Sequence, residues 1–105
     1  MKMVYVFEII DKNKKEIHLT EERLKHIRKH PHMQDSVEKI KDVLKNPHTT
    51  RIEDDKSVLY FYKEFKEMSK QERYLMVSVK YLNGNGFVIT SFFTNKITGE
   101  IWKTK

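Results

Sequence analysis

The chain contains no cysteine, only three glycines and only two prolines among its 105 residues. Without cysteine, neither a disulfide framework nor a thiolate zinc site can form. The sequence also lacks a Gly-rich phosphate loop, a dinucleotide-binding fingerprint and a serine nucleophile elbow. No apolar run is long enough to span a bilayer. We therefore expect a cytoplasmic protein with no membrane segment and no cofactor.

Positive charge is in excess and is concentrated in two segments of a chain whose length suits one domain, residues 1–105. The net charge is +6. The cations of the two segments are Arg23, Lys25, Arg28, Lys29, Lys80, Lys96, Lys103 and Lys105. If folding brings the segments together, they form a basic patch suited to a polyanion. The alternative is a solvated helix face and a frayed basic tail.

Two helices are predicted in the first half of the chain. Thr20 is a good N-cap, and the helix that it begins stops at His30 because a proline follows. Asp35 or Ser36 caps the second helix, in which apolar residues recur at helical spacing until Asn46-Pro47.

The rest of the chain predicts strands. The expected strands cover residues 4–10, 16–19, 49–52, 57–65, 73–82 and 87–94, with 101–102 as a possible edge. The run Asn83-Gly84-Asn85-Gly86 is typical of a tight hairpin turn, so the strands on either side of it should be antiparallel neighbours. The order predicts an α+β fold: an N-terminal β-hairpin, two α-helices, and an antiparallel β-meander forming a four- to five-stranded sheet.

Alternation assigns the faces of the last two long strands. In the strand over residues 73–82, the residues expected on the core face are Leu75, Val77, Val79 and Tyr81. Those expected on the other face are Tyr74, Met76, Ser78 and Lys80. In the second strand Phe87, Ile89, Ser91 and Phe93 alternate with Val88, Thr90, Phe92 and Thr94. Neither of these last two sets is purely polar. We therefore expect one half-open face bearing Thr, Ser, Tyr and Lys side chains, where chemistry would take place.

Histidine is the first candidate for that chemistry. His26 and His30 lie four residues apart on the first helix, and imidazole titrates near neutral pH, as a proton shuttle in RNA cleavage requires. The alternative is a charged helix edge with a helix-stop motif. Two histidines supply only half of a zinc site, so we predict no metal.

A second group of candidates carries cations, phenols and hydroxyls. Metal-free RNA cleavage needs proton transfer and neutralisation of the phosphorane charge. The side chains that could supply these are Arg51, Tyr62, Lys80, Thr90, Thr94 and Lys96. Threonine and tyrosine in strands also serve β-propensity, and the aromatic runs Tyr60-Phe61-Tyr62 and Phe92-Phe93 could stack bases or fill the core. The acidic run Glu53-Asp54-Asp55 lies in a predicted loop, which argues against a two-metal nuclease.

The order of several short motifs resembles a known family. These motifs are the runs 17–27, His30-Pro31, Lys45-Asn46-Pro47, Arg51, 59–62, 74–80 and 87–94. Together they resemble the phage-associated nuclease-like domains grouped with barnase, EndoU, colicin-type toxins and RelE. The resemblance covers roughly residues 15–103.

The resemblance implies a metal-independent ribonuclease fold with a cleft on the sheet, and it implies roles by position. Residues that match catalytic positions are His26 as general acid or base, Arg51 and Lys80 as phosphate clamps, and Thr94 as an oxyanion hydrogen-bond donor. Residues expected to bind substrate are Tyr60, Tyr62 and Thr90. His30 and Lys96 are further candidates for substrate binding.

We therefore expect an endoribonuclease of toxin or mobile-element type. Its partners would be RNA (tRNA, rRNA or mRNA) and a cognate antitoxin or immunity protein. The alternatives are a non-catalytic nucleic-acid-binding module and a toxin-like protein-interaction module. Salt dependence separates phosphate binding from protein binding, because phosphate contacts release counterions.

Overall fold

The computed structural model describes residues 4–52 and 57–102. The acidic run Glu53-Asp54-Asp55 and the basic residues Lys103 and Lys105 lie outside the described residues. Within the described ranges no helix has both the length and the apolar character needed to cross a membrane.

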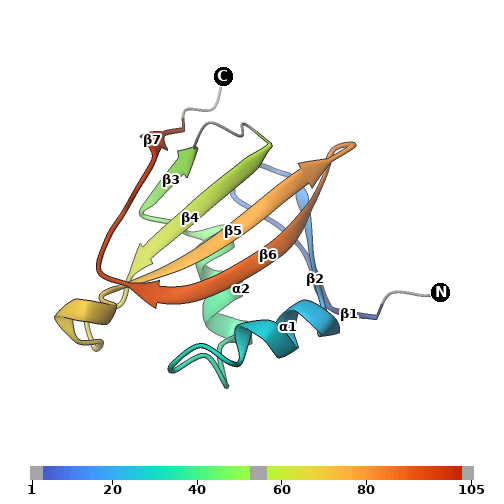
Figure 1. The fold of residues 1–105 in the computed structure, drawn as a ribbon. Coiled ribbons are helices and arrows are strands. Elements are labelled where there is room, and N and C mark those ends of the chain that lie inside the picture. The colour runs from blue at the N-terminus through green and yellow to red at the C-terminus, as the bar shows by residue number, and fades with distance from the viewer. Residues whose placement is uncertain (1–3, 53–56, 103–105) are drawn as a thin grey trace.

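The described elements follow the predicted order (Figure 1). They are β1 (Tyr5–Ile10), β2 (Glu16–Thr20), α1 (Glu21–Ile27), α2 (Val37–Lys45), β3 (Thr49–Ile52), β4 (Val58–Glu64), the short 3₁₀ helix η1 (Lys70–Glu72), β5 (Tyr74–Leu82), β6 (Asn85–Thr94) and β7 (Glu100–Ile101). The α+β class, the hairpin and the two helices are confirmed.

The strands form one mixed, mostly antiparallel sheet with seven strands in the order β1-β2-β6-β5-β4-β3-β7. The expected four- to five-stranded antiparallel sheet was too small, because the N-terminal hairpin joins the same sheet. β2 runs parallel to β6, and Ile17 lies beside Gly86 in that register. Ile17 is fully buried, and its Cδ1 lies against Gly86 across this pairing. Hairpin turns mark antiparallel neighbours in a sequence, whereas a parallel pair between distant segments has no such local mark.

The core lies between the sheet and α2, which crosses behind β4 and β5 (Figure 1). Ile40 and Leu44 of α2 and Phe61 and Val77 of the sheet are fully buried in it. Ser36 is the N-cap residue of α2, as expected, but its side chain makes no capping bond. The buried Ser36 hydroxyl instead donates to the carbonyl of Met33 at 2.6 Å.

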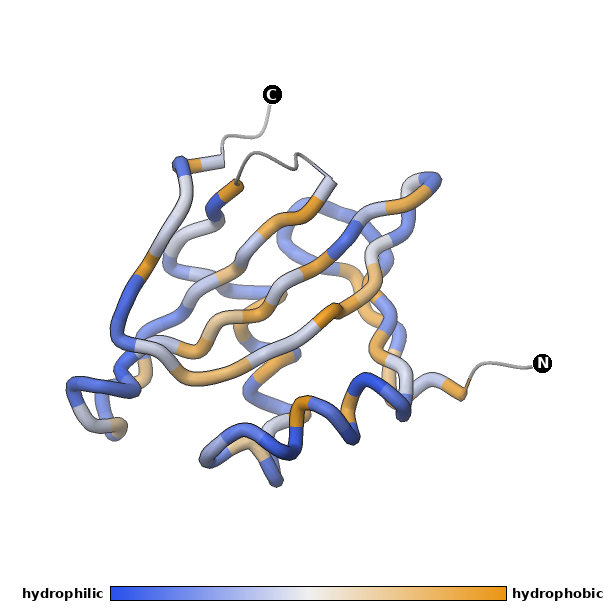
Figure 2. Tube along the Cα trace, in the orientation of Figure 1, coloured by the Kyte–Doolittle hydropathy of each residue, from blue (hydrophilic) through white to orange (hydrophobic). Residues whose placement is uncertain are grey.

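Helix α1 is shorter than predicted. Thr20 caps it, since its Oγ1 accepts from the Arg23 amide at 3.2 Å. The helix ends at Ile27, and the amide of His30 donates to the Ile27 carbonyl, three residues back. The proline after His30 disfavours helical geometry there, so the last turn tightens before the chain leaves the helix. Figure 2 shows α1 as mostly hydrophilic, which fits a helix whose buried residues are Leu24 and Ile27.

A β-bulge in β6 changes which side chains face the core. The β5–β6 turn is the predicted one, with positive φ at Asn83 (54°) and Gly84 (84°). Val79 pairs with Val88, but Ser78 pairs with Thr90, so Ile89 is an extra residue. The residues of β6 that share the core face are therefore Gly86, Val88, Ser91 and Phe93, while those on the outward face are Phe87, Thr90, Phe92 and Thr94. The uninterrupted alternation predicted for β6 was wrong.

Candidate nucleic-acid interface

The sheet face that points away from α2 carries most of the predicted site residues. Directly opposed residues in an antiparallel ladder point to the same face. Arg51 opposes Tyr60, Tyr60 opposes Ser78, and Ser78 opposes Thr90. These four residues therefore form one row, which we call the Arg51 row. It crosses β3, β4, β5 and β6, which lie side by side in Figure 1.

Lys80 lies in the next row on the same face. Its ladder neighbours are Val58 on β4 and Phe87 on β6. With strands about 4.8 Å apart and a rise of about 3.3 Å per residue, the Cα atoms of Arg51 and Lys80 are roughly 12 Å apart. The two predicted phosphate clamps thus flank the half-buried ring of Tyr60.

The Arg51 guanidinium is held in place by two neighbours. Its Nε donates to Thr49 Oγ1 at 3.2 Å, and its Nη1 donates to the carbonyl of Gly99 at 3.3 Å. Gly99 belongs to the segment that connects β6 to β7. This connection therefore helps to hold the Arg51 side chain in position at the edge of the outward face. Both bonds reduce the conformational freedom that the side chain would lose on binding an anion.

Tyr62 shares the face but is not accessible to a base. It is only 3% exposed, and its hydroxyl lies 3.4 Å from Thr98 Oγ1 in the same β6–β7 connection. A ring covered in this way packs against protein. The structure therefore favours a packing role for Tyr62 over the predicted stacking role.

Thr94 and Lys96 lie at the end of β6, away from the Arg51 row. Thr94 opposes Tyr74, four residues along the strand from Thr90, which is roughly 13 Å at the usual strand rise. Its Oγ1 accepts from the Lys96 amide at 3.2 Å. Lys96 is exposed. Arg51 lies three strands away from β6 as well, so a single bound phosphate cannot contact both Thr94 and Arg51.

The histidines of the predicted helical pair do not share one site. His26 is exposed on α1, which packs mainly against β6, β2 and β1, and β6 is three strands away from β3 in the sheet. His30 follows the helix and its ring lies 5.4 Å from that of Phe92. The structure therefore does not bring His26 beside Arg51, and His30 is the one that reaches the outward face.

His18 is a residue to which sequence reasoning gave no role. It is 8% exposed and stacks on Phe87 with ring centroids 5.0 Å apart. It also lines a hollow of about 420 Å³, together with Thr20, Glu22, Arg23, Leu82, Phe87 and Val88. The signal that could have found it is the alternation of Glu16 and His18 along one strand, which puts both on one face.

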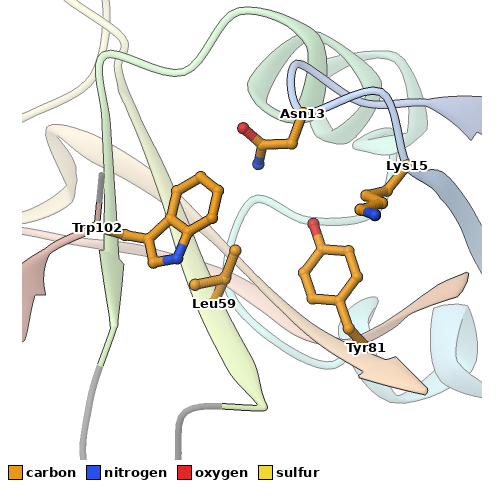
Figure 3. Close-up of a pocket in the computed structure, with 5 residues that line it drawn as sticks. All are labelled: Asn13, Lys15, Leu59, Tyr81 and Trp102. Atoms are coloured by element: carbon orange, nitrogen blue, oxygen red, sulfur yellow. The ribbon is translucent and has the colours of Figure 1, made fainter. Parts of the chain in front are cut away.

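A second hollow lies on the other side of the sheet (Figure 3). It has a volume of about 170 Å³ and is lined by Asn13, Lys15, Leu59, Tyr81 and Trp102. The Tyr81 hydroxyl donates to Asp11 Oδ2 at 2.6 Å. Burial, followed by this hydrogen bond, raises the pKa of the Tyr81 phenol far above its usual range. A phenol held protonated in this way serves structure, so we do not place the functional site there.

Comparisons with protein families, with curated proteins and with solved structures find no match to this chain. The resemblance to the nuclease-like domains therefore stays a prediction from the motifs alone.

Proposed function

We propose that this protein binds single-stranded RNA on the outward face of β3, β4, β5 and β6. The observation that carries the proposal is the Arg51 row, with a braced arginine opposite a half-buried tyrosine. Arginine and lysine neutralise phosphates, and aromatic rings stack on unpaired bases. A cation, an aromatic ring and a second cation in order across a sheet suit a flexible strand.

The charge of the chain supports the same partner. The net charge is +6, and the basic residues Arg28 and Lys29 follow α1, which packs against β6, beside the strand that carries Lys80. Arg23 of α1 also lines the hollow next to Phe87. An RNA strand that continues past Lys80 would meet Arg23 there, with the acidic Glu22 lining the same hollow. An acidic antitoxin or immunity protein would compete for these cations.

Metal-independent RNA cleavage is the second candidate function. The observation that favours it is that the phenol of Tyr60 and the hydroxyl of Thr90 share a row with Arg51. Cleavage needs a proton carrier beside a phosphate clamp, and tyrosine can act as one. We assign that part to Tyr60 rather than His26, because His26 lies on α1, away from β3.

The test measures binding and cleavage on the same RNA. A fluorescent single-stranded RNA is titrated with wild-type protein in EDTA at salt concentrations from roughly 50 to 200 mM. We expect the affinity to fall steeply with salt, and each of Arg51→Ala and Lys80→Ala to reduce the logarithmic salt slope by about 0.7. Lys45→Ala, an exposed lysine at the end of α2 on the opposite face, is the matched control and should leave the slope unchanged.

The outcomes separate the two functions. Equal affinities for wild type, Arg51→Ala and Lys80→Ala would refute the proposed interface. Salt-sensitive binding with intact RNA would establish a binding protein and reject cleavage. Discrete fragments that disappear with Arg51→Ala and Tyr60→Phe, but not with Lys45→Ala, would establish a ribonuclease.

A further inference from the structure

Three potential metal ligands converge on one face of the N-terminal hairpin. Glu16 and His18 are two residues apart on β2, so they point to the same face. Glu8 on β1 lies directly opposite His18 in the antiparallel register. One ligand atom from each of these three side chains lies within 4.8 Å of the other two.

The contact between His18 and Glu8 fits two ligands of one ion better than a hydrogen bond. Its Nδ1 is 3.1 Å from Glu8 Oε2, yet this buried nitrogen has no hydrogen-bond partner among the described residues. The two atoms are close but not aligned. Two ligands of one tetrahedral Zn²⁺, each bonded at about 2.0–2.2 Å, lie roughly 3.3 Å apart and both point at the ion instead of at each other.

The imidazole is fixed while the carboxylates can adjust. The His18 ring lies between those of Tyr5, at 4.9 Å, and Phe87, at 5.0 Å, and its side chain is only 9% exposed. The side chains of Glu8 and Glu16 are 48% and 46% exposed. Glu16 Oε1 is 3.8 Å from His18 Nε2, so its carboxylate must swing toward Nδ1 to complete the set.

We propose that Glu8, Glu16 and His18 bind one divalent transition-metal ion, Zn²⁺ in particular. An imidazole with two carboxylates is a nitrogen–oxygen donor set that suits Zn²⁺, whereas Mg²⁺ prefers oxygen alone. Three protein ligands leave one position of a four-coordinate ion for water or another ligand. The proposal is independent of RNA binding, which is measured in EDTA.

The rival arrangement uses the same three side chains without an ion. A protonated His18 would be held between the two carboxylates as an imidazolium. The two arrangements differ in what Zn²⁺ does, because an ion must displace the proton from the ligating nitrogen. Binding of the ion to His18 itself is therefore the deciding observation.

The experiment titrates ZnCl₂ into the untagged protein by calorimetry and follows the histidine side-chain nitrogens by NMR. We expect one ion per chain and a large shift of His18 Nδ1. Glu8→Gln and Glu16→Gln keep the side-chain volume at exposed positions, so they should fold. Each should weaken Zn²⁺ binding by at least about tenfold, which is the loss that even an outer-shell substitution causes.

The control is Glu22→Gln, which removes one negative charge beside the same hollow without removing a proposed ligand. Its Zn²⁺ affinity should stay within about twofold of wild type, since charge alone has only a small effect at an exposed site. The absence of saturable binding would refute the proposal and support the imidazolium. An equal loss in all three variants, or a shift at His26, His30 or His32 in place of His18, would also refute it.

Discussion

Arg51 on β3 and Tyr60 on β4 lie directly opposite each other, at adjacent positions on the outward face of the sheet. The β6–β7 connection holds the arginine through Gly99, so its position relative to Tyr60 depends on a segment distant in sequence. A strand bound between them would have its phosphate and its base contacted by neighbouring side chains.

Tyr60→Ala should weaken single-stranded RNA binding by about 1–3 kcal/mol, the usual cost of losing one base–aromatic stack. Tyr60→Phe keeps the ring and should bind within about 0.5 kcal/mol of wild type, because a stack needs no hydroxyl. Fluorescence anisotropy with one labelled RNA measures both. If Tyr60→Phe loses as much affinity as Tyr60→Ala, the hydroxyl and not the ring contacts the RNA.

Tyr81→Phe should destabilise the fold by about 1.5–3 kcal/mol, because the Asp11 carboxylate, which is 4% exposed, loses a hydrogen-bond donor. Urea unfolding at pH 7 gives the loss, and a double-mutant cycle with Asp11→Ala isolates the pair. A coupling energy near zero would show that the contact contributes nothing.

Burial of the Tyr81 phenol, together with this hydrogen bond, predicts a stability change in alkali. The raised pKa of Tyr81 means that the unfolded chain ionises first as the pH passes about 10. The stabilisation of the fold by the protonated Tyr81 phenol is therefore complete below that pH and declines above it. The stability difference between wild type and Tyr81→Phe should therefore narrow from pH 9 to pH 11, as measured by urea unfolding. A difference that stays constant over this range would contradict the prediction.

Asp42→Asn should destabilise the protein at neutral pH but not in acid. The hydrogen bond from Lys63, 2.6 Å away, lowers the pKa of the Asp42 carboxyl below its usual value. Because the pKa is lowered in the folded state, the ionised carboxylate stabilises the fold at pH values above the unfolded-state pKa of about 4. This stabilisation is lost as the pH falls below that value. The Asp42 side chain is 40% exposed, so the effect at pH 7 should be about 1 kcal/mol or less.

Thermal unfolding of wild type and Asp42→Asn between pH 2 and pH 7 tests this dependence. The two melting temperatures should converge as the pH falls below the lowered pKa of the folded-state carboxyl, because the group is then neutral in both states. Asp35→Asn, an exposed aspartate before α2, is the control. A gap that persists at pH 2 would assign the loss to packing instead of charge.

Gly86→Ala should destabilise the fold by about 1–3 kcal/mol through overpacking. A Cβ at this position would lie 2.9 Å from Val79 Cγ1 and would also clash with Ile17 Cδ1. Ile17→Val removes that methyl group, so the double variant should recover part of the loss in urea unfolding. Purely additive effects of Gly86→Ala and Ile17→Val would show that the crowding lies elsewhere.

The local parts of the fold could be predicted because their causes are local. Asn83 and Gly84 adopt positive φ where an Asn-Gly turn was expected, and Thr20 caps α1 through its own hydroxyl. The parallel pairing of β2 with β6 could not be predicted, since it depends on burying Ile17 against a distant strand. The bulge at Ile89 also has no sequence signal, because a single residue is inserted without glycine or proline.

The candidate site could be predicted only in part, for a related reason. Alternation puts Ser78 and Lys80 on one face of β5, but only the bulge at Ile89 brings Thr90 to that face, and sequence patterns did not place Arg51 and Tyr60 beside them. These patterns could not show that Tyr62 is covered, because Thr98 reaches it from a connection with no regular structure. The same patterns missed His18, whose environment combines β1, β2 and β6.

The parallel pairing of β2 with β6 also constrains how the chain folds. β2 belongs to the N-terminal hairpin, and its sheet neighbour β6 lies near the other end of the described chain. The two strands can therefore pair only after β6 has been synthesised. During synthesis from the N-terminus, one edge of β2 therefore stays unpaired until β6 has been made. The apolar side chains of Ile17 and Leu19 are incompletely buried until then. Such long-range closure slows folding and leaves a strand edge available to other chains. Co-translational folding should therefore be completed only once β6 has left the ribosome.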